Sequence, residues 1–312
     1  MLSIIIPTKD RTEILKLTLQ KAIEAIEGFE IEIIVVNDGN EIKEKFENPK
    51  IQYFKNPKKG VTTARNYGAS LAQSNLLLFL DDDMWITAES LMAIDTLHKK
   101  SFFDQSCAVL NWKYPDTLIQ RMKSEKVGRY LLQANYHTLE GRLNQKIDRS
   151  NLLQAITIIS SGSFIMSKKN FFTLGGYTET FRFSGEDEDL SERLLHSKIQ
   201  LFLYTPISCF HNQSDRLSID HFLKRETRGY FSLSSSKYFS LPQSKIKLWV
   251  YTSFIPFRLL FVVVFYLVPN YALFDFITFK TIGILSSIIY FSAWYATDKT
   301  TSSKPLKHTK ND

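Results

Sequence analysis

Residues 75–89 read NLLLFLDDDMWITAE, and this stretch decides the fold. Residues 76–80 form an unbroken apolar run, which predicts a strand buried on both faces, as in a parallel sheet covered by helices. Three carboxylates follow it directly: Asp81, Asp82 and Asp83. Because ligands of such sheets bind just beyond the carboxyl ends of the strands, the acids lie where a ligand is expected.

Alternation along an extended backbone predicts that Asp81 and Asp83 point together and that Asp82 turns away. Two carboxylates that close repel each other unless a cation lies between them. A hard divalent ion that completes its shell with substrate phosphates fits such a pair. The competing interpretation is a solvated acidic turn before the helix that begins at Thr87, and the three acids alone do not separate the two.

Strands and helices alternate along the chain, which predicts a doubly wound, largely parallel α/β sheet with helices on both faces. The strands are predicted at residues 2–6, 31–36, 51–54, 76–80, 108–112, 156–166 and 199–204. The helices are predicted at residues 12–27, 61–73, 87–100, 168–174 and 186–198, with a basic helical region around 216–240. Residues 116–145 have only a weak, mixed helical pattern.

The composition is that of a globular protein. A chain of 312 residues is long enough for one large domain and an appendage, and its net charge of +7 is modest and regional. We therefore expect no nucleic-acid partner. Cys107 and Cys209 lack metal-ligand spacing and are predicted to be buried thiols in a reducing compartment. Pro7 stops the first apolar run, which predicts a strand rather than a signal peptide and places this part of the chain in the cytoplasm.

Two further residues are predicted at the same sheet edge. Asp38 follows the second strand, where a carboxylate can accept hydrogen bonds from a base or from ribose hydroxyls, although an Asp-Gly turn explains it as well. Arg65 lies in the first turns of a helix entered through Gly60. An arginine there is a natural partner for a diphosphate, and a surface charge is the alternative.

Six segments occur in the order and spacing of the family 2 glycosyltransferases, and the resemblance covers about residues 1–215. They are SIIIPTKDR, VVNDGN, GVTTARNYGA, LLFLDDDM, SGSFIMSKKNFFTLGGYTETF and GEDEDLSERL. The resemblance implies the GT-A fold, a nucleotide-diphosphate sugar donor and Mg²⁺ or Mn²⁺. It also implies that an acceptor hydroxyl attacks the anomeric carbon with inversion.

The resemblance assigns roles to individual residues. The donor pocket would be formed by Pro7, Thr8, Asp10, Arg11, Asp38, Arg65, Asp81 and Asp82. The metal contacts would be Asp83, as the likelier direct ligand, Asp81, and His211 just past the last predicted strand. The catalytic base would be Asp187. The sugar and acceptor cleft would be walled by Ser161, Gly162, Gly175, Gly176 and Glu186.

Some of these assignments have competing explanations. Asn37 and Met84 stand where many relatives carry further acids, and His211 is equally well explained as an ordinary loop histidine. Acids at residues 186–189 also favour a helix N-terminus by about 0.3–1 kcal/mol each. Four acids in a row repel one another, which indicates that at least one serves chemistry.

The last third of the chain changes character. Residues 249–268 are nearly all apolar, and residues 282–296 form a second apolar stretch. We therefore divide the chain into a catalytic domain (1–215), a basic helical linker (216–248), an apolar region (249–297) and a basic tail (298–312). Flanking lysines fit a membrane hairpin with both ends in the cytoplasm. Helices buried in a homo-oligomer interface or lying flat among lipid headgroups are the alternatives.

The sequence is therefore interpreted as a metal-dependent inverting glycosyltransferase on the cytoplasmic side of the membrane, acting on a glycan or lipid-linked acceptor to build a surface glycan or glycolipid. Two other functions are weighed against it. A non-catalytic nucleotide-sugar binding module would not need the metal carboxylates and Asp187. A sugar nucleotidyltransferase usually carries a Gly-rich loop after the first strand, and PTKDR has no glycine. The identities of donor and acceptor do not follow from the sequence pattern.

Overall fold

The structure, a computed structural model, describes residues 2–181, 184–234, 236–237 and 257–302. Within these residues, one sheet has the strand order β3-β2-β1-β4-β8-β6-β9-β5, and β7 pairs with β9 beside it. The strands are β1 Leu2–Thr8, β2 Ile31–Asn37, β3 Ile51–Lys55, β4 Leu76–Leu80, β5 Met84–Ile86, β6 Ser106–Lys113, β7 Leu153–Ala155, β8 Ser163–Ser167 and β9 Gln200–His211.

The direction of the strands brings one set of strand ends together. β3, β2, β1 and β4 are parallel, while β8 runs antiparallel between β4 and β6. Two antiparallel steps restore the original direction, so β6 and its parallel neighbour β9 point the same way as β4. The carboxyl ends of β1, β2, β4, β6 and β9 therefore share one edge of the sheet. The predicted, mostly parallel arrangement is confirmed, with β8 as an antiparallel insertion.

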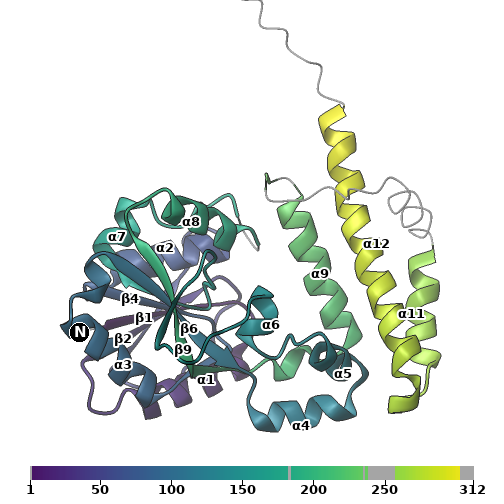
Figure 1. Cartoon of the computed structure of the whole chain (residues 1–312), viewed down its shortest axis with the longest axis horizontal. Helices are drawn as coiled ribbons and strands as arrows, with labels where there is room; N and C mark the ends of the chain where they lie inside the picture. Colours follow the sequence, from purple (N-terminus) through teal and green to yellow (C-terminus); the bar gives the residue numbers. More distant parts are fainter. Residues whose placement is uncertain (1, 182–183, 235, 238–256, 303–312) are drawn as a thin grey trace, which may run out of the picture.

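Helices cover both faces of the sheet. Figure 1 shows α2, α7 and α8 on one side and α1 and α3 on the other. All five residues of β4 are buried, as its unbroken apolar run predicts. The helices are α1 Thr12–Ala25, α2 Val61–Leu71, α3 Ala88–Lys99, α4 Asp116–Ser124, α5 Lys126–Gln133, α6 Leu139–Leu143, α7 Lys168–Thr173, α8 Glu186–Leu195, α9 Ile219–Leu233, α11 Arg258–Leu267 and α12 Asp275–Ser302, with 3-10 turns η1 Phe102–Asp104, η2 Ser214–Arg216 and η4 Ala272–Phe274.

Three local predictions are wrong. The strand predicted at 156–166 is a loop over residues 156–162, and only its end belongs to a strand, β8; the short strand β7 lies before the predicted range. The last strand does not end at residue 204: β9 passes Pro206 at an irregularity in its pairing with β6, a place where proline is tolerated, and continues to His211. The helical pattern of residues 186–198 predicts that Leu195 faces inward with Leu190 and Leu194, but Leu195 is the last residue of α8 and is 61% exposed.

The carboxyl-terminal helices pack against the globular part of the chain. α11 and α12 lie side by side next to α9 (Figure 1). Arg129 Nε on α5 donates to both carboxylate oxygens of Asp275, at 2.8 and 2.9 Å, and Ser286 Oγ on α12 donates to Glu226 on α9 at 2.7 Å. α12 also buries Ile282 in this contact region. The hairpin formed by α11 and α12 is therefore fastened to α5 through Asp275 and to α9 through Ser286.

The apolar region contains one stretch of membrane-spanning dimensions among the described residues. Ala272–Ala293 is long and apolar enough to cross a membrane, and one third of its most apolar part is buried inside the protein. The first predicted span began at residue 249, and residues 249–256 lie outside the described part. What the structure describes of it is the ten-residue helix α11.

Candidate functional site

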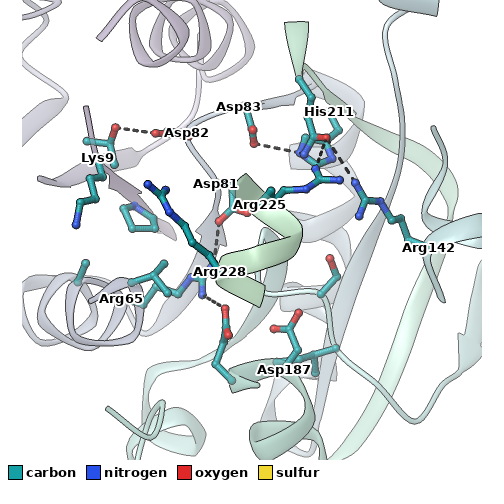
Figure 2. A pocket seen from close by; sticks show the side chains of 18 of the residues that line it. Lys9, Arg65, Asp81, Asp82, Asp83, Arg142, Asp187, His211, Arg225 and Arg228 are labelled. Carbon is teal, nitrogen blue, oxygen red and sulfur yellow. Dashed lines mark hydrogen bonds and ion pairs between the residues drawn. The ribbon is translucent and has the colours of Figure 1, made fainter. Parts of the chain in front are cut away.

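A cavity of about 840 Å³ opens at the sheet edge where the strand ends meet. This volume is in the range of pockets that hold small-molecule ligands. Figure 2 shows charged side chains facing it from different segments, among them Lys9, Arg65, Asp81, Asp187 and Arg225. The sheet topology explains this gathering because each of these segments starts or ends at the same edge.

The three consecutive acids lie in a turn. β4 ends one residue before them, and the amide of Met84 donates to the carbonyl of Asp81 at 3.0 Å. The prediction that Asp81 and Asp83 point together while Asp82 turns away is therefore wrong. Asp82 is buried and shares Arg11 with Asp83, whereas the more exposed Asp81 pairs elsewhere.

Asp82 and Asp83 form a buried charged cluster with Arg11. Thr8 Oγ1 donates to Asp82 at 2.7 Å, and Arg11 Nη1 contacts Asp82 and lies 3.0 Å from Asp83 Oδ2. Burial raises the pKa of Asp82 to about 7, although the Arg11 charge opposes this. Burial also opposes ionisation of Asp83, but the nearby His211, Arg216 and Arg11 outweigh it and hold the pKa of Asp83 below its usual value. The cluster thus keeps Asp83 as a carboxylate.

His211 reaches Asp83 because of strand pairing. β5 pairs with β9 so that Met84 lies opposite His211, and the His211 Nε2 atom lies 3.1 Å from Asp83 Oδ1. The rings of Trp112 and Tyr114 pack edge-on against the imidazole, with centroids 4.8 and 5.6 Å away. His211 is therefore the last residue of a strand and not part of the loop predicted to follow it.

Arg65 links the acidic turn to helix α8. Its Nη2 lies 2.8 Å from Asp81 Oδ1, its Nη1 lies 3.1 Å from Glu186 Oε1, and its guanidinium lies over the ring of Tyr177. Only 3% of Arg65 is exposed. Burial disfavours its charge, but the carboxylates outweigh this and hold the pKa of Arg65 above its usual value.

Asp187 lies in the first turn of α8 and faces the same cavity. Its Oδ1 accepts hydrogen bonds from both the amide and the hydroxyl of Ser161, the amide at 3.1 Å. Burial, followed by repulsion from Glu186, raises the pKa of Asp187 to about 8, while Arg65 opposes the shift. Burial is therefore a larger cause of the raised pKa of Asp187 than the acids next to it in the sequence.

Most of the residues predicted for the donor pocket line the cavity. Those that follow the first two strands and do so are Pro7, Thr8, Arg11 and Asp38. Asp38 accepts hydrogen bonds from the Gly60 amide at 3.0 Å, from Asn56 at 2.7 Å and from Lys9 at 3.1 Å, and these bonds outweigh burial and lower its pKa.

Asp10 lies outside the cavity lining. Its backbone has a left-handed φ of 54°, and its carboxylate accepts hydrogen bonds from the backbone and side chain of Asn40, at 2.7 and 3.0 Å. Asp10 thus fastens the loop after β1 to the loop after β2.

The glycines predicted for the acceptor cleft do not line the cavity, but they position residues that do or that contact them. A Cβ atom on Gly162 would lie 2.6 Å from Asp81 Oδ2, so only glycine admits that carboxylate. Gly175 and Gly176 have φ values of 85° and 67° and turn the chain after α7 toward Tyr177, the ring beneath Arg65. Ser161 acts in the same way, through its bonds to the catalytic candidate Asp187.

The sequence did not single out the residues on the α6 and α9 side of the cavity. These residues are Arg142, Gln213, Arg216, Arg225 and Arg228. Their segments were recognised only as a weak helical pattern and as a basic helical region. No motif within either segment predicts that they face Asp83 and His211.

The chain was compared with known proteins. Glycosyl transferase family 2 matches residues 3–173, and the N-terminal domain of galactosyltransferase matches residues 142–215. Chondroitin synthase of Escherichia coli is 27% identical in an alignment of 222 residues that covers 62% of this chain and 32% of that protein. An uncharacterized glycosyltransferase of Rickettsia bellii (strain RML369-C) is 29% identical in an alignment of 197 residues that covers 59% of this chain and 25% of that protein. The chain spans about a third or less of the length of these curated relatives.

A solved structure supports the same fold. GalNAc-T7 with UDP, GalNAc and Mn²⁺ aligns with a TM-score of 0.51 and 16% identity, over 68% of this chain and 43% of that one. At this identity the likeness shows the fold alone, which is the GT-A fold.

The charged cluster yields a prediction about stability. Arg11→Gln removes the cation shared by Asp82 and Asp83, and breaking a buried pair in this way costs about 3–5 kcal/mol. We expect that loss in the free energy of unfolding at pH 8, measured by chemical denaturation. The loss should shrink toward pH 5, because Asp82, whose folded-state pKa is raised, takes up a proton in the folded protein and no longer repels Asp83.

The matched control is Lys16→Gln, which removes an exposed ion pair with Glu44 and should leave stability unchanged within error. A pH-independent loss in the Arg11 variant would contradict the electrostatic explanation.

Proposed function

The chain belongs to glycosyl transferase family 2, and from this premise we propose that it transfers a sugar from a nucleotide-diphosphate donor to a hydroxyl of a glycan or lipid-linked acceptor with inversion. The observation that carries the proposal is the convergence of Asp81 and Asp83, from the turn after β4, and of Asp187, from α8, on one cavity. The charge held on Arg65 beside them suits a diphosphate. The activity of the whole protein is part of the proposal, because the chain covers only part of its curated relatives.

The donor would lie along the Asp38 and Arg65 side of the cavity. One Asp38 oxygen is held by Asn56 and Gly60. Among the described residues, the other accepts only from Lys9, whose side chain is 57% exposed. Lys9 is free to swing aside, which would let Asp38 accept hydrogen bonds from a base or from ribose hydroxyls. The diphosphate would then extend toward Arg65, whose unpaired Nε is a further donor.

The residues present fit a divalent ion that is bound jointly by the protein and by the phosphates of the donor. Among the described residues, no group of three or more His, Cys, Asp and Glu side chains could hold a metal by itself. Asp83 Oδ2 is buried and makes no hydrogen bond, although the Arg11 and Arg216 guanidinium groups lie 3.0 and 3.4 Å from it, and His211 Nε2 lies 3.1 Å from Asp83 Oδ1. Mg²⁺ and similar ions are commonly held by one or two protein groups plus phosphates and water, so Asp83 and His211 would suffice. A bound Mg²⁺ or Mn²⁺ would neutralise charge on the departing diphosphate.

Asp187 would act as the general base. As the acceptor oxygen forms its bond to the anomeric carbon, the bond from that carbon to the diphosphate breaks, and the hydroxyl proton passes to Asp187. Ser161 holds the carboxylate in place through two hydrogen bonds. One base is enough because a single displacement with inversion forms no covalent intermediate. Arg65 would stabilise the negative charge that develops on the leaving group.

Membrane association is a second part of the proposal. Large apolar side chains are exposed on α11, on the connection to α12 and on its first turn: Leu259, Leu260, Val263, Tyr266, Leu267, Tyr271, Leu273, Phe276 and Ile277. A contiguous apolar surface of this kind marks an interaction site. Because contacts with α5 and α9 fasten the hairpin to the globular part, we favour helices inserted in the headgroup layer of the cytoplasmic leaflet over a spanning hairpin.

The base assignment is tested by Asp187→Asn. We expect transfer to fall at least about a hundredfold, the scale of a lost general base, while donor affinity measured by calorimetry stays nearly unchanged. Released nucleoside diphosphate, rather than pyrophosphate, is the product to follow, since pyrophosphate would identify a nucleotidyltransferase. Glu188→Gln is a neighbouring control that should retain most of the rate. A product with retained anomeric configuration would contradict the mechanism.

The pKa of Asp187 gives this assignment a pH signature. Only the ionised carboxylate accepts a proton, so kcat/KM should rise with pH and level off above about 8 in the native protein. That ascending limb should disappear in the Asp187→Asn variant. An unchanged limb would assign the titration to another group, such as Asp82.

The metal ligands are tested by comparing neighbouring acids. Asp83→Ala should abolish the dependence of donor binding on Mn²⁺, whereas Asp82→Asn keeps an acceptor for Thr8 and should change it only a few fold. Titration calorimetry with and without the ion measures both, and thermal unfolding separates a folding defect from lost ligation. Equal losses in the two variants would speak against Asp83 as the direct ligand.

The membrane surface is tested with Leu267→Asp combined with Leu273→Asp. We expect binding of the full chain to anionic vesicles, measured by flotation, to fall at least about tenfold, because each charge opposes burial of the apolar surface in lipid. Leu195→Asp is the matched control, since Leu195 is also exposed but lies on α8. A native protein that stays entirely in buffer would refute membrane association.

A further inference from the structure

Two arginines on the α6 and α9 side of the cavity have no carboxylate partner among the described residues. Arg225 Nη1 lies 3.0 Å and Arg142 Nη2 lies 3.5 Å from the same atom, Gln213 Oε1. That oxygen also accepts a 2.7 Å hydrogen bond from the hydroxyl of Tyr114. The Arg142 Nε atom is buried and has no partner. One neutral amide oxygen therefore serves three donors and neutralises neither charge.

The arginines on the opposite side of the cavity are paired with carboxylates. Arg11 and Arg65 each contact two or more carboxylates. For Arg225, burial and the nearby Arg142 charge instead lower the pKa to about 10. Two guanidinium groups held near each other without a counterion make a site of positive potential, which an anion entering the cavity would relieve.

The geometry of the pair suits an oxyanion. The Arg142 guanidinium lies over the ring of Tyr136, with the centroid 5.1 Å away, and this contact fixes its plane. Arg225 is oriented by its hydrogen bond to Gln213. Planar guanidinium groups with fixed orientation bind phosphate and carboxylate oxygens in pairs, which gives both affinity and direction.

The location points to the acceptor. Figure 2 shows Lys9 and Arg65 on one side of the cavity and Arg142 and Arg225 on the other, with the Asp83 and His211 pair near the latter. The donor pocket already has Arg65 for its diphosphate. An anion at Arg142 and Arg225 would sit beyond His211, next to helices α6 and α9, where the acceptor would enter.

We propose that Arg142 and Arg225 form an oxyanion subsite that binds a phosphate or carboxylate group carried by the acceptor. Assigning the anion to the acceptor rests on the proposed glycosyl transfer, whereas the subsite itself rests on the arginine geometry. The acceptor class is then an anionic one, such as a sugar acid or a phosphate-linked glycan, and neutral glycans would bind more weakly.

The test uses the full chain with Mn²⁺ and saturating nucleoside diphosphate, so that the donor pocket is filled. Inorganic phosphate and glucuronate are titrated by calorimetry, with glucose as the neutral comparison. We expect Arg142→Gln and Arg225→Gln each to lower phosphate and glucuronate affinity at least tenfold and to change nucleoside diphosphate affinity less than twofold. Arg149→Gln, which removes a more exposed arginine paired with Glu140, should leave both unchanged.

The outcomes separate the possible occupants. A tenfold loss of nucleoside diphosphate affinity in both variants would assign the arginines to the donor diphosphate and overturn the proposal, as would unchanged phosphate and glucuronate affinity. If the native protein binds no nucleoside diphosphate, the proposed function fails, and the phosphate titration alone still reports on the subsite. Thermal unfolding controls for folding. If Arg225→Gln unfolds, Arg142→Gln and the charge-retaining Arg225→Lys carry the test, and Arg225→Lys should lower the affinity because lysine cannot make the paired contacts, but by less than Arg142→Gln does.

Discussion

The buried ion pairs of Arg65 are the interaction on which the site depends. This one guanidinium joins α2 to the turn after β4 and to the first residue of α8. α8 is distant in sequence from the other two segments and meets them at the shared edge of the sheet. Because a buried charge without partners is strongly destabilising, the carboxylates of Asp81 and Glu186 are required where they stand. Asp187, the residue after Glu186, takes its position from the same constraint.

A second constraint is the distribution of charge across the cavity. On one side, Arg11 and Arg65 are balanced by carboxylates, which fixes their geometry and keeps Asp83 ionised. On the other side, Arg142 and Arg225 share a neutral amide oxygen. The side on which arginines are paired with carboxylates keeps its geometry without a ligand. The side on which Arg142 and Arg225 share the amide oxygen gains stability when an anion binds. The two sides therefore suit different parts of a reaction between two substrates.

The carboxyl-terminal hairpin is tied to the chemistry through α9. The same helix carries Arg225 toward the cavity and Glu226 toward α12. α5 holds the start of α12 through Arg129 and Asp275. If the apolar surface of the hairpin lies in a membrane, these contacts fix the distance between the membrane and the cavity. A lipid-linked acceptor would then reach the cavity from a defined direction.

The sequence by itself determined the local features of this protein. The unbroken apolar run of β4, the alternating strands and helices and the order of six motifs predicted the α/β sheet, the family and the edge where the acids gather. These features depend on periodicity and short spacing, which are properties of neighbouring residues. Only the tertiary structure decided the rest: that the acids form a turn in which Asp82 is buried beside Asp83, that Asp10 fastens two loops, and that burial raises the pKa of Asp187. It also brought Arg142 and Arg225 to one glutamine from helices 83 positions apart in the chain. Burial and charge balance depend on which distant segments meet, and no local pattern contains that information.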